Sequence, residues 1–596
     1  QVDPLPHQIE AVYHYVLRSP RIRFLIADDP GAGKTIMAGL ILKELQLRQR
    51  LRRVLIVAPG HLKTQWQREM KERFGETFVI VDRALMNAGW AGNVWEEHDD
   101  AIVSIDFIKQ PAVRETLRSA RWDLVIVDEA HKMAAYAYET KRERTVDKTQ
   151  RYRAGEILSQ QTEHLLFLTA TPHKGDAEAF RLFLDLLRPG FFGRPDLLEE
   201  SVRDGDNPIF VRRLKEDMKR FDGAPIFPPR HVKTVAFRLT DGERALYNGV
   251  TRYVQEYFDR AKENRSIAFA LMILQRRLTS STHAICRSLE RRRARLEELL
   301  TLPERIREAR EDYLQAANLT DEEIEDLPED ERMDIEARVE HLTIAKNIAD
   351  VQVEIDELTD LIAQAQVVRA QAEESKLAAL RDDILSNLGD RKLLIFSEFK
   401  DTLDYLAGDG APARAGGAAR AGGQERPLGK LIEWGYDVVT IDGSMTMDAR
   451  IEAEHTFRDK AQIMVATEAA GEGINLQFCS LMVNYDIPWN PNRLEQRMGR
   501  IHRYGQPYEV FIWNLLARDT REGQILERLF EKLDRMREAL GSDRVFDIID
   551  QVLPGTRLDT LIREAIFSQR RMEEIEQHID AVNVDSLRRT MDEAFL

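Results

Sequence analysis

The sequence has only two cysteines, Cys286 and Cys479, in 596 residues. Two cysteines cannot build a disulfide framework or a multi-cysteine metal site, and this scarcity is typical of proteins of the reducing cytosol. No run of about 18 apolar residues is present, so we expect no membrane span. The chain begins at Gln1 without a signal-peptide pattern. We therefore expect a cytoplasmic protein whose natural N-terminus is missing or processed.

An excess of positive charge is also lacking, since the formal net charge is −16. The charge is unevenly distributed, however. Residues 320–341 are strongly acidic, whereas residues 287–295 (RSLERRRAR) are strongly basic. A nucleic-acid-binding protein needs only one basic face, so the total does not exclude this class. We expect the basic run to be a solvated or internally paired helix face rather than a grip on DNA.

Short apolar, β-branched runs alternate with helical patterns in two parts of the chain. Unbroken apolar strands separated by helices indicate a parallel sheet covered on both faces. The sequence therefore predicts two α/β lobes. The expected strands are residues 24–27, 54–57, 78–81, 101–105, 124–127 and 165–168 in the first lobe, and 393–396, 438–441, 463–466, 481–485 and 510–513 in the second.

The segment between the lobes is nearly free of glycine and rich in Leu, Glu, Arg and Ala. This composition predicts long amphipathic helices. The Gly- and Ala-rich residues 408–427 predict a disordered surface insertion. The expected domains are a first lobe (1–225), a helical insertion (226–385), a second lobe (386–540) and a helical C-terminal segment (541–596).

A glycine-rich loop follows the first expected strand at residues 28–35 (DDPGAGKT). Gly31 and Gly33 let the backbone N–H groups turn inward, and the following helix adds its positive end. Lys34 can reach the β- and γ-phosphates of a nucleotide, and the Thr35 hydroxyl can bind Mg²⁺. The strict phosphate-loop pattern is not met, because Asp28 stands where its first glycine would be.

A second acidic motif strengthens this interpretation. Residues 124–127 run directly into Asp128, Glu129, Ala130 and His131. A carboxylate at the end of a neighbouring parallel strand lies where Mg²⁺ on a phosphate loop sits. Asp128 is thus a candidate Mg²⁺ ligand, and Glu129 can polarise the attacking water. Thr169 and Thr171, after the strand 165–168, are candidates for a relay from the γ-phosphate edge to the other lobe.

The second lobe contains an arginine-rich segment, residues 493–503 (RLEQRMGRIHR). Arg500 and Arg503 are three residues apart, so we expect them to share a helix face. Guanidinium groups that reach across a cleft would stabilise the charge of phosphoryl transfer. The sequence therefore predicts an ATPase site supplied by both lobes.

Together these motifs resemble superfamily 2 helicase-type ATPases with two RecA-like lobes, and among them the SNF2 family. The departures are Pro30 and Ala32 in the phosphate loop. The ending LEQRMGRIHRYGQ is most similar to prokaryotic members, which include an RNA-polymerase-associated ATPase and phage-defence proteins. The segments that carry the resemblance are 5–8 (LPHQ), 28–35, 55–66, 128–131, 168–172, 210–215 (FVRRLK), 227–230 (FPPR), 394–399, 441–444, 466–476 and 489–506.

The resemblance implies an ATP- and Mg²⁺-dependent motor that translocates along double-stranded DNA and remodels or displaces bound protein, with accessory subunits or a DNA-bound protein as partner. Phosphate-backbone contacts are needed in both lobes. The implied residues are, for the nucleotide, Gln8 at the adenine, Asp28, Gly31, Ala32, Gly33, Lys34, Thr35 and Gly473; for DNA, His61, Lys63, Thr64, Ser397, Lys400, Thr467, Gly471 and Asn475; and for coupling, His131, Thr169, Thr171 and Gln496.

Two other functions remain open from the sequence. One is a strand-separating DNA or RNA helicase, which the long helical insertion argues against. The other is a scaffold that binds nucleotide without hydrolysing it, which the filled positions Lys34, Glu129, Arg500 and Arg503 argue against. We expect the tryptophans Trp66, Trp434 and Trp489 to fill packing sites rather than to stack bases, because no interleaved basic and aromatic pattern is present.

Overall fold

The structure, a computed structural model, describes residues 3–48, 51–88, 93–140, 143–170, 177–193, 208–213, 215–260, 265–301, 332, 335–336, 348–371, 373–408, 420–421, 424–425, 428–468, 474, 476–540, 558–567 and 570–581. The chain forms two compact units. The first comprises Gln1–Pro228 and His502–Gln506, and the second Pro229–Ile501 and Pro507–Val584. No helix within the described ranges is long and apolar enough to cross a bilayer.

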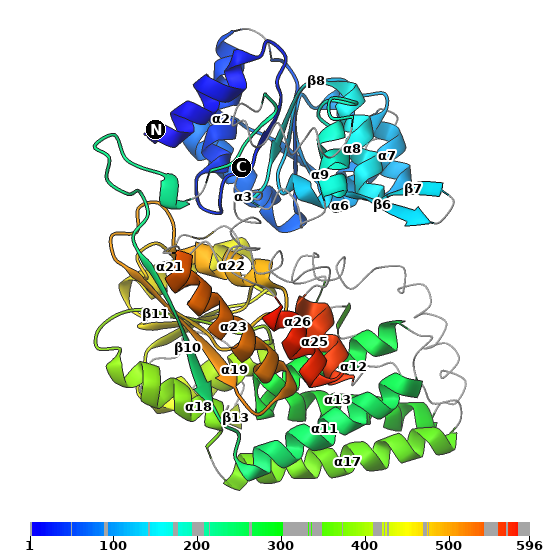
Figure 1. The fold of residues 1–596 in the computed structure, drawn as a ribbon, viewed down its shortest axis with the longest axis vertical. Helices are drawn as coiled ribbons and strands as arrows, with labels where there is room; N and C mark the ends of the chain where they lie inside the picture. Colours follow the sequence, from blue (N-terminus) through cyan, green and yellow to red (C-terminus); the bar gives the residue numbers. More distant parts are fainter. Residues whose placement is uncertain are drawn as a thin grey trace. The chain divides into compact units, whose positions relative to one another are not determined.

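The first unit is built on a seven-stranded sheet in which all strands are parallel, in the order β3-β4-β2-β5-β8-β1-β9. Strand β8 of this sheet is labelled in Figure 1. All six strands expected in this lobe are present. The strands are β1 (Arg23–Ile26), β2 (Val54–Ala58), β3 (Val79–Val81), β4 (Asp100–Ser104), β5 (Trp122–Val127), β8 (Thr162–Leu168) and β9 (Phe210–Val211).

Helices cover both faces of this sheet, as the apolar strands predict. Alternate strand residues enter two separate cores: Leu55 and Val125 face one, Ile56 and Ile126 the other. Each large aliphatic side chain buried in this way contributes about 1.5–3 kcal/mol. The helices are α1 (Pro6–Ile9), α2 (Lys34–Leu47), α3 (Lys63–Glu69), α4 (Arg83–Ala88), α5 (Val94–Glu97), α6 (Ile105–Ile108), α7 (Pro111–Leu117), α8 (Gln150–Gln161) and α9 (Ala177–Asp185).

The second unit contains a six-stranded parallel sheet in the order β10-β17-β16-β11-β15-β14. The five strands expected here are present, and the prediction of two parallel-sheet lobes is confirmed. The strands are β10 (Arg230–Phe237), β11 (Leu393–Phe396), β14 (Val438–Ile441), β15 (Ile463–Ala466), β16 (Leu481–Asn484) and β17 (Val510–Ala517).

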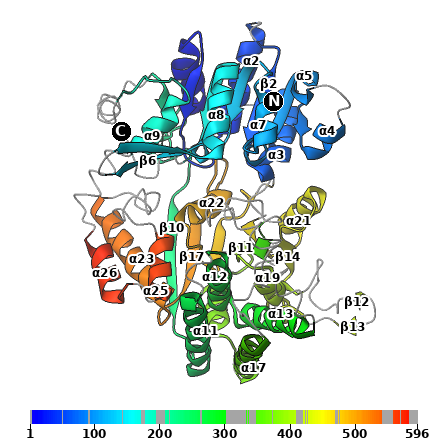
Figure 2. The same ribbon diagram turned by 90° about the vertical axis from the view of Figure 1, so that its right-hand side faces the viewer.

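Long helices accompany this second sheet. Helix α12 packs against α11 and α13, and α13 packs against both α17 and α19 (Figure 2). The helices are α11 (Asp241–Arg260), α12 (Arg265–Ser280), α13 (Thr282–Thr301), α17 (Ile348–Gln371), α18 (Ser375–Ala379), α19 (Lys400–Ala407), α20 (Lys430–Glu433), α21 (Met447–Asp459), α22 (Pro491–Ile501), α23 (Arg521–Leu540), α25 (Leu558–Ile566) and α26 (Met572–Asp580).

A strand precedes the helices in the segment expected as a helical insertion. Residues 230–237 form β10, the edge strand next to β17, and the helices begin only at Asp241. The strand has no unbroken apolar run. Along residues 230–234 the more covered positions Arg230, Val232 and Thr234 alternate with the exposed positions His231 and Lys233. Such alternation suits an edge strand with one covered face, whereas an unbroken apolar run marks a strand covered on both faces.

Three further elements were also not expected. They are the two-residue strand β9 and the antiparallel pair β6 (Ala135–Thr140) and β7 (Glu143–Lys148). The expected disordered insertion at 408–427 lies mostly outside the described residues; within it, β12 (Arg420–Ala421) pairs with β13 (Gln424–Glu425). Helices α25 and α26 lie in the expected C-terminal helical segment. The four domain boundaries themselves stay a prediction.

Candidate active site

The loop between β1 and α2 is shaped by two glycines in the left-handed region. The φ angle is +86° at Gly31 and +87° at Gly33, values that other residues adopt only at a cost. A Cβ atom on Gly33 would lie 2.4 Å from Nε2 of Gln8. The conformation at Gly33 therefore favours glycine, and a Cβ there would also displace the amide of Gln8.

Lys34, the first residue of α2, holds this loop through its side chain. Its Nζ donates to the carbonyl oxygens of Asp28 at 2.7 Å and Asp29 at 3.2 Å. The ammonium group, the N–H groups of a 14-residue helix and a glycine-curled backbone thus converge on one place. This combination fits a phosphate chain. The half-buried Thr35 follows in the sequence, so a hydroxyl suited to Mg²⁺ is close to the same loop.

Gln8 is joined directly to this loop. Its Nε2 donates to the carbonyl oxygen of Ala32 at 3.1 Å, and its Oε1 accepts from the backbone N–H of Leu5 at 3.0 Å. The ring Nε2 of His7 lies 2.9 Å from the same carbonyl, and burial lowers the pKa of this histidine. The predicted adenine-binding residue therefore supports the backbone of the phosphate loop, and adenine reading stays a prediction.

Asp28, the residue that departs from the strict phosphate-loop pattern, is fully buried. Its carboxylate pairs with Arg213, with Nη2 to Oδ2 at 2.5 Å and Nε to Oδ1 at 3.2 Å. Arg213 follows β9, which pairs with β1, and it also donates to the carbonyl oxygen of His7. The pair neutralises the buried charge and ties the loop to the N-terminal segment. Arg213 was not predicted as a site residue, although the connector FVRRLK that contains it had been noted.

The two acidic residues after β5 adopt the expected position at the end of a buried strand. Glu129 has φ of 48°, and within the described part of the chain it alone among non-glycine residues has a positive φ. Backbone strain of this kind is concentrated at functional sites. Burial, together with the charge of Glu129, raises the pKa of Asp128. Burial also disfavours the Glu129 charge, but His131, Lys34 and Lys132 outweigh this effect and lower its pKa.

Trp66 contributes to this centre in a way the sequence did not reveal. The residue is buried, as expected for packing, but its indole Nε1 also donates to Oδ2 of Asp128 at 2.8 Å. Trp66 lies on α3, which follows β2, and β2 pairs with β5. Two neighbouring strands therefore bring together groups 62 residues apart.

His131 and Thr169, both predicted to couple the site to the second lobe, are in contact. Nδ1 of His131 lies 2.8 Å from Oγ1 of Thr169 and 3.3 Å from Oε2 of Glu129. Thr169 follows β8, the strand between β5 and β1. The candidate water-activating carboxylate is therefore linked through one imidazole to the next strand. Thr171 lies outside the described residues.

The two predicted arginines are placed differently. Arg500 is half-buried on α22 in the second unit, whereas residues 502–506 belong to the first. The expectation that both arginines share a helix face is wrong, because α22 ends at Ile501. The Cγ of Arg503 lies 3.2 Å from the position of a Cβ on Gly31, and Nζ of Lys215 donates to the carbonyl oxygen of His502 at 3.1 Å. Arg503 therefore lies beside the phosphate loop.

Two predicted DNA contacts in the second unit require correction. Ser397 is fully buried, and its hydroxyl donates to Oδ2 of Asp486 at 2.5 Å. Thr467 is also buried, and its backbone N–H and hydroxyl both donate to the carbonyl oxygen of Ile441, at 3.0 and 3.5 Å. These groups do not face solvent, because they join strand ends within the unit. Nζ of Lys400 is 2.7 Å from Oδ2 of Asp442.

The remaining predicted residues are untested. Lys63 is half-buried at the start of α3, Thr64 and Gln496 are exposed, and Ala32 is buried. Gly471, Gly473 and Asn475, and the side chain of His61, lie outside the described residues. Their contacts with nucleotide or DNA stay predictions.

Comparison with known proteins agrees with the site. Residues 7–288 match the model of the SNF2-related domain, and residues 375–505 match the helicase conserved C-terminal domain. The uncharacterized ATP-dependent helicase YqhH of Bacillus subtilis is 30% identical over 546 residues, which cover 90% of this chain and 80% of YqhH.

Two other similar proteins are more distant. The RNA polymerase-associated protein RapA of Vibrio campbellii is 26% identical over 94% of this chain, which spans only 53% of the length of RapA. The SWI2/SNF2 ATPase core of Sulfolobus solfataricus, solved with double-stranded DNA, aligns over 97% of both chains with 14% identity and a TM-score of 0.33. The family models and the similarity to YqhH establish that the chain is an ATPase belonging to the SNF2 family of ATP-dependent helicases and translocases.

Proposed function

We propose that the protein translocates along double-stranded DNA at the expense of ATP and remodels or displaces protein complexes bound to it. The observation that carries the proposal is the set of long helices between β10 and β11. They span 20 residues in α11, 16 in α12, 20 in α13 and 24 in α17. The family resemblance implies that such a helical block distinguishes SNF2-like motors from simple unwinding helicases.

The residues of the first unit fit the chemistry of ATP hydrolysis. Backbone N–H groups around Gly31 and Gly33, the start of α2 and the Lys34 ammonium bind the phosphates. Thr35 and Asp128 would hold Mg²⁺, which neutralises phosphate charge when bound. Glu129, ionised because its pKa is lowered, accepts a hydrogen bond from the attacking water and orients it. Arg503 of the same unit would supply positive charge for the transition state, and Arg500, on α22 of the second unit, is proposed for the same role.

The cellular role is proposed as either recycling of transcription complexes or defence against phage. The first rests on the RapA relatives, whose name associates them with RNA polymerase, and the second on the family resemblance. Retention of purified RNA polymerase on the immobilised protein would favour the first. A loss of phage resistance in cells carrying Lys34→Ala would favour the second.

The decisive experiment measures ATP turnover with duplex DNA, single-stranded DNA or RNA over a salt series. We expect the largest stimulation by duplex DNA and its loss at high salt, because phosphate contacts release counterions. Equal stimulation by RNA would overturn the substrate assignment. Robust separation of a forked duplex, without preference for duplex in the ATPase assay, would instead identify a strand-separating helicase.

A further inference from the structure

A buried carboxylate lies at the carboxyl end of the second sheet, where Asp486 follows β16. Its Oδ1 accepts from Nζ of Lys376 at 2.8 Å, and its Oδ2 accepts from the hydroxyls of Ser280 at 2.8 Å and Ser397 at 2.5 Å. The backbone N–H of Glu398 donates to Oδ2 at 3.2 Å. Only 7% of Asp486 is exposed, so these donors replace the water that a carboxylate would otherwise bind.

Two of these donors come from the helices that precede β11. Ser280 is the last residue of α12, and Lys376 lies in α18. The Lys376 ammonium also donates to the carbonyl oxygens of Thr279 at 2.8 Å and Ser280 at 3.1 Å. A cation is favourable at these carbonyls, which the last turn of a helix leaves without partners. One ammonium group thus joins the end of α12 to the carboxylate of Asp486.

A second ion pair strengthens the same junction. Arg276, one turn earlier on α12, forms a two-pronged pair with Glu398, with Nη2 to Oε1 at 2.7 Å and Nε to Oε2 at 3.2 Å. Glu398 follows β11, and the guanidinium also lies 5.7 Å from the ring centroid of Trp489, just before α22. The end of α12 is therefore fastened to two strand ends and to the approach of α22.

Asp486 also supports α22 directly. Its backbone carbonyl accepts from Nη1 of Arg497 at 2.6 Å, and Nε of the same arginine donates to Oε1 of Glu468, after β15, at 2.8 Å. Arg497 is 1% exposed. It lies on α22 three residues before Arg500, one of the arginines proposed for the ATPase site. Asp486, which binds the end of α12, therefore also binds α22, the helix that contains Arg500.

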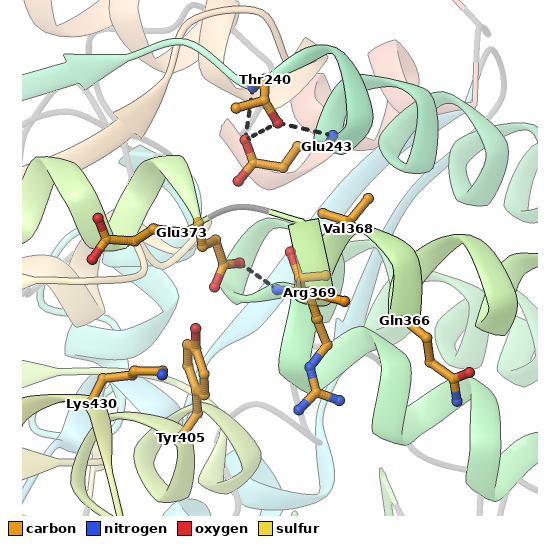
Figure 3. Close-up of a pocket in the computed structure, with 11 residues that line it drawn as sticks. Thr240, Glu243, Gln366, Val368, Arg369, Glu373, Tyr405 and Lys430 are labelled. Atoms are coloured by element: carbon orange, nitrogen blue, oxygen red, sulfur yellow. Dashed lines mark hydrogen bonds between the residues drawn. The ribbon is translucent and has the colours of Figure 1, made fainter. Parts of the chain in front are cut away.

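A cavity lies beside the residues that precede α18. Residues Glu373 and Glu374, directly before this helix, line a cavity of about 330 Å³ together with the start of α11 and the end of α17 (Figure 3). Across this cavity, Oε1 of Glu243 accepts from the backbone N–H of Ser375 at 2.8 Å. Leu377 and Ala379 pack α18 into the core of the second sheet. On the side of the cavity, polar contacts hold the helix instead, among them the pair of Lys376 with Asp486.

From these contacts we infer that Lys376 is a positioning residue for Arg500. Its ammonium group connects the end of α12 to Asp486. Because Asp486 also binds Arg497, the position of Lys376 affects the position of Arg497 and the orientation of α22. A movement of the helices α11–α17 is then transmitted to Arg500, the arginine proposed to stabilise the transition state. The inference rests on the proposed role of Arg500 in ATP hydrolysis.

The test is Lys376→Met in the full chain, with turnover measured at saturating ATP and nucleotide binding measured at equilibrium. We expect the turnover number to fall about tenfold or more, as for misplacement of a transition-state group. The nucleotide Kd should change less than about twofold, because the contacts that bind ATP in the ground state are unchanged. Lys392→Met is the matched control: Nζ of Lys392 donates to the carbonyl oxygen of Ala461 at the opposite end of the sheet. Its turnover should equal that of the wild type.

A second variant separates positioning from stability. Asp486→Asn added to Lys376→Met removes the buried unpaired charge and should restore the melting temperature. Turnover should stay low, because the end of α12 remains untied. Recovery of turnover together with melting temperature, or normal turnover in Lys376→Met itself, would overturn the inference. If Lys376→Met fails to fold, Lys376→Arg, which keeps the charge but changes its shape, is measured against the same outcomes.

Failure of the proposed function would look different. If duplex DNA does not stimulate the wild type more than RNA does, translocation on DNA is wrong. The basal turnover of Lys376→Met relative to the wild type then still tests the positioning role.

Discussion

The polar residues at the carboxyl ends of the two sheets differ in exposure and in how completely they are bonded to one another. In the first unit, Thr35, Lys34 and Glu129 are half-buried, two glycines have positive φ, and Glu129 itself is strained. In the second unit, Ser397 and Arg497 are buried, and both donate to the buried Asp486. Similar parallel sheets thus present groups able to meet a substrate in one case and a closed polar network in the other. We take the first edge to perform chemistry and the second to transmit position.

The strongest test of this contrast is Glu129→Gln. We expect ATP turnover to fall by about 10²–10⁴, the usual contribution of a general base, with nucleotide binding retained. Rapid-quench hydrolysis and equilibrium binding of a fluorescent ATP analogue measure the two effects. Glu163→Gln is the control, since Glu163 is exposed near the amino end of β8. Normal turnover in Glu129→Gln would show that this edge is not where water is activated.

Arg213→Met tests the buried pair that compensates for Asp28. Loss of one partner leaves an uncompensated buried charge and should cost about 3–5 kcal/mol in unfolding free energy. Urea unfolding followed by tryptophan fluorescence measures it. Arg48→Met should cost at most about 0.5 kcal/mol, because Arg48 forms an exposed pair with Glu44 four residues earlier. Equal costs in the two variants would mean that Asp28 does not need its partner.

The closed network in the second unit should make that unit sensitive to acid. Burial disfavours the Glu398 charge, but Arg276, Arg497 and Arg493 outweigh it and lower its pKa from 4.5 to about 2. A lowered carboxyl pKa stabilises the folded state above pH 4.5, and this contribution is lost as the pH falls toward 2. The difference in unfolding free energy between wild type and Glu398→Gln should therefore be largest above pH 4.5 and shrink below it. A difference independent of pH would contradict the ion pair.

The smallest expected effect belongs to Trp66→Phe, which keeps an aromatic ring but removes the bond to Asp128. A hydrogen bond to a charged group contributes about 1.5–3 kcal/mol. We expect part of this to appear as a rise of a few-fold in the Mg²⁺ concentration needed for half-maximal turnover. Trp122→Phe, at the amino end of β5, is the control, since no acceptor in the described structure binds its indole N–H. Equal Mg²⁺ dependence in both variants would show that Trp66 contributes only to packing.

Local patterns predicted the parts of the protein that depend on neighbouring residues. The apolar runs located all eleven expected strands because a strand buried on both faces needs an unbroken apolar sequence. Asp128 and Glu129 were identified because they follow such a strand directly. The edge strand β10 was missed, since its alternating exposure resembles a helix face or a loop as much as a strand.

Pairings between distant residues could not be predicted in this way. Asp28 looked like a defect in the phosphate loop until Arg213, 185 residues later, was found to pair with it. Ser397 looked like a DNA contact until Asp486 was found to bind its hydroxyl, 89 residues later. Many charged residues could serve as partners, and only the strand order selects one.

By itself, the sequence determined that the chain has two parallel-sheet lobes, a phosphate loop and an acidic motif after a buried strand, because periodicity and short motifs are local properties. Only the tertiary structure decided which polar groups remain open to a substrate and which are closed by a partner. Burial makes an unpaired polar group costly, so its role depends on what the fold places within about 3 Å of it.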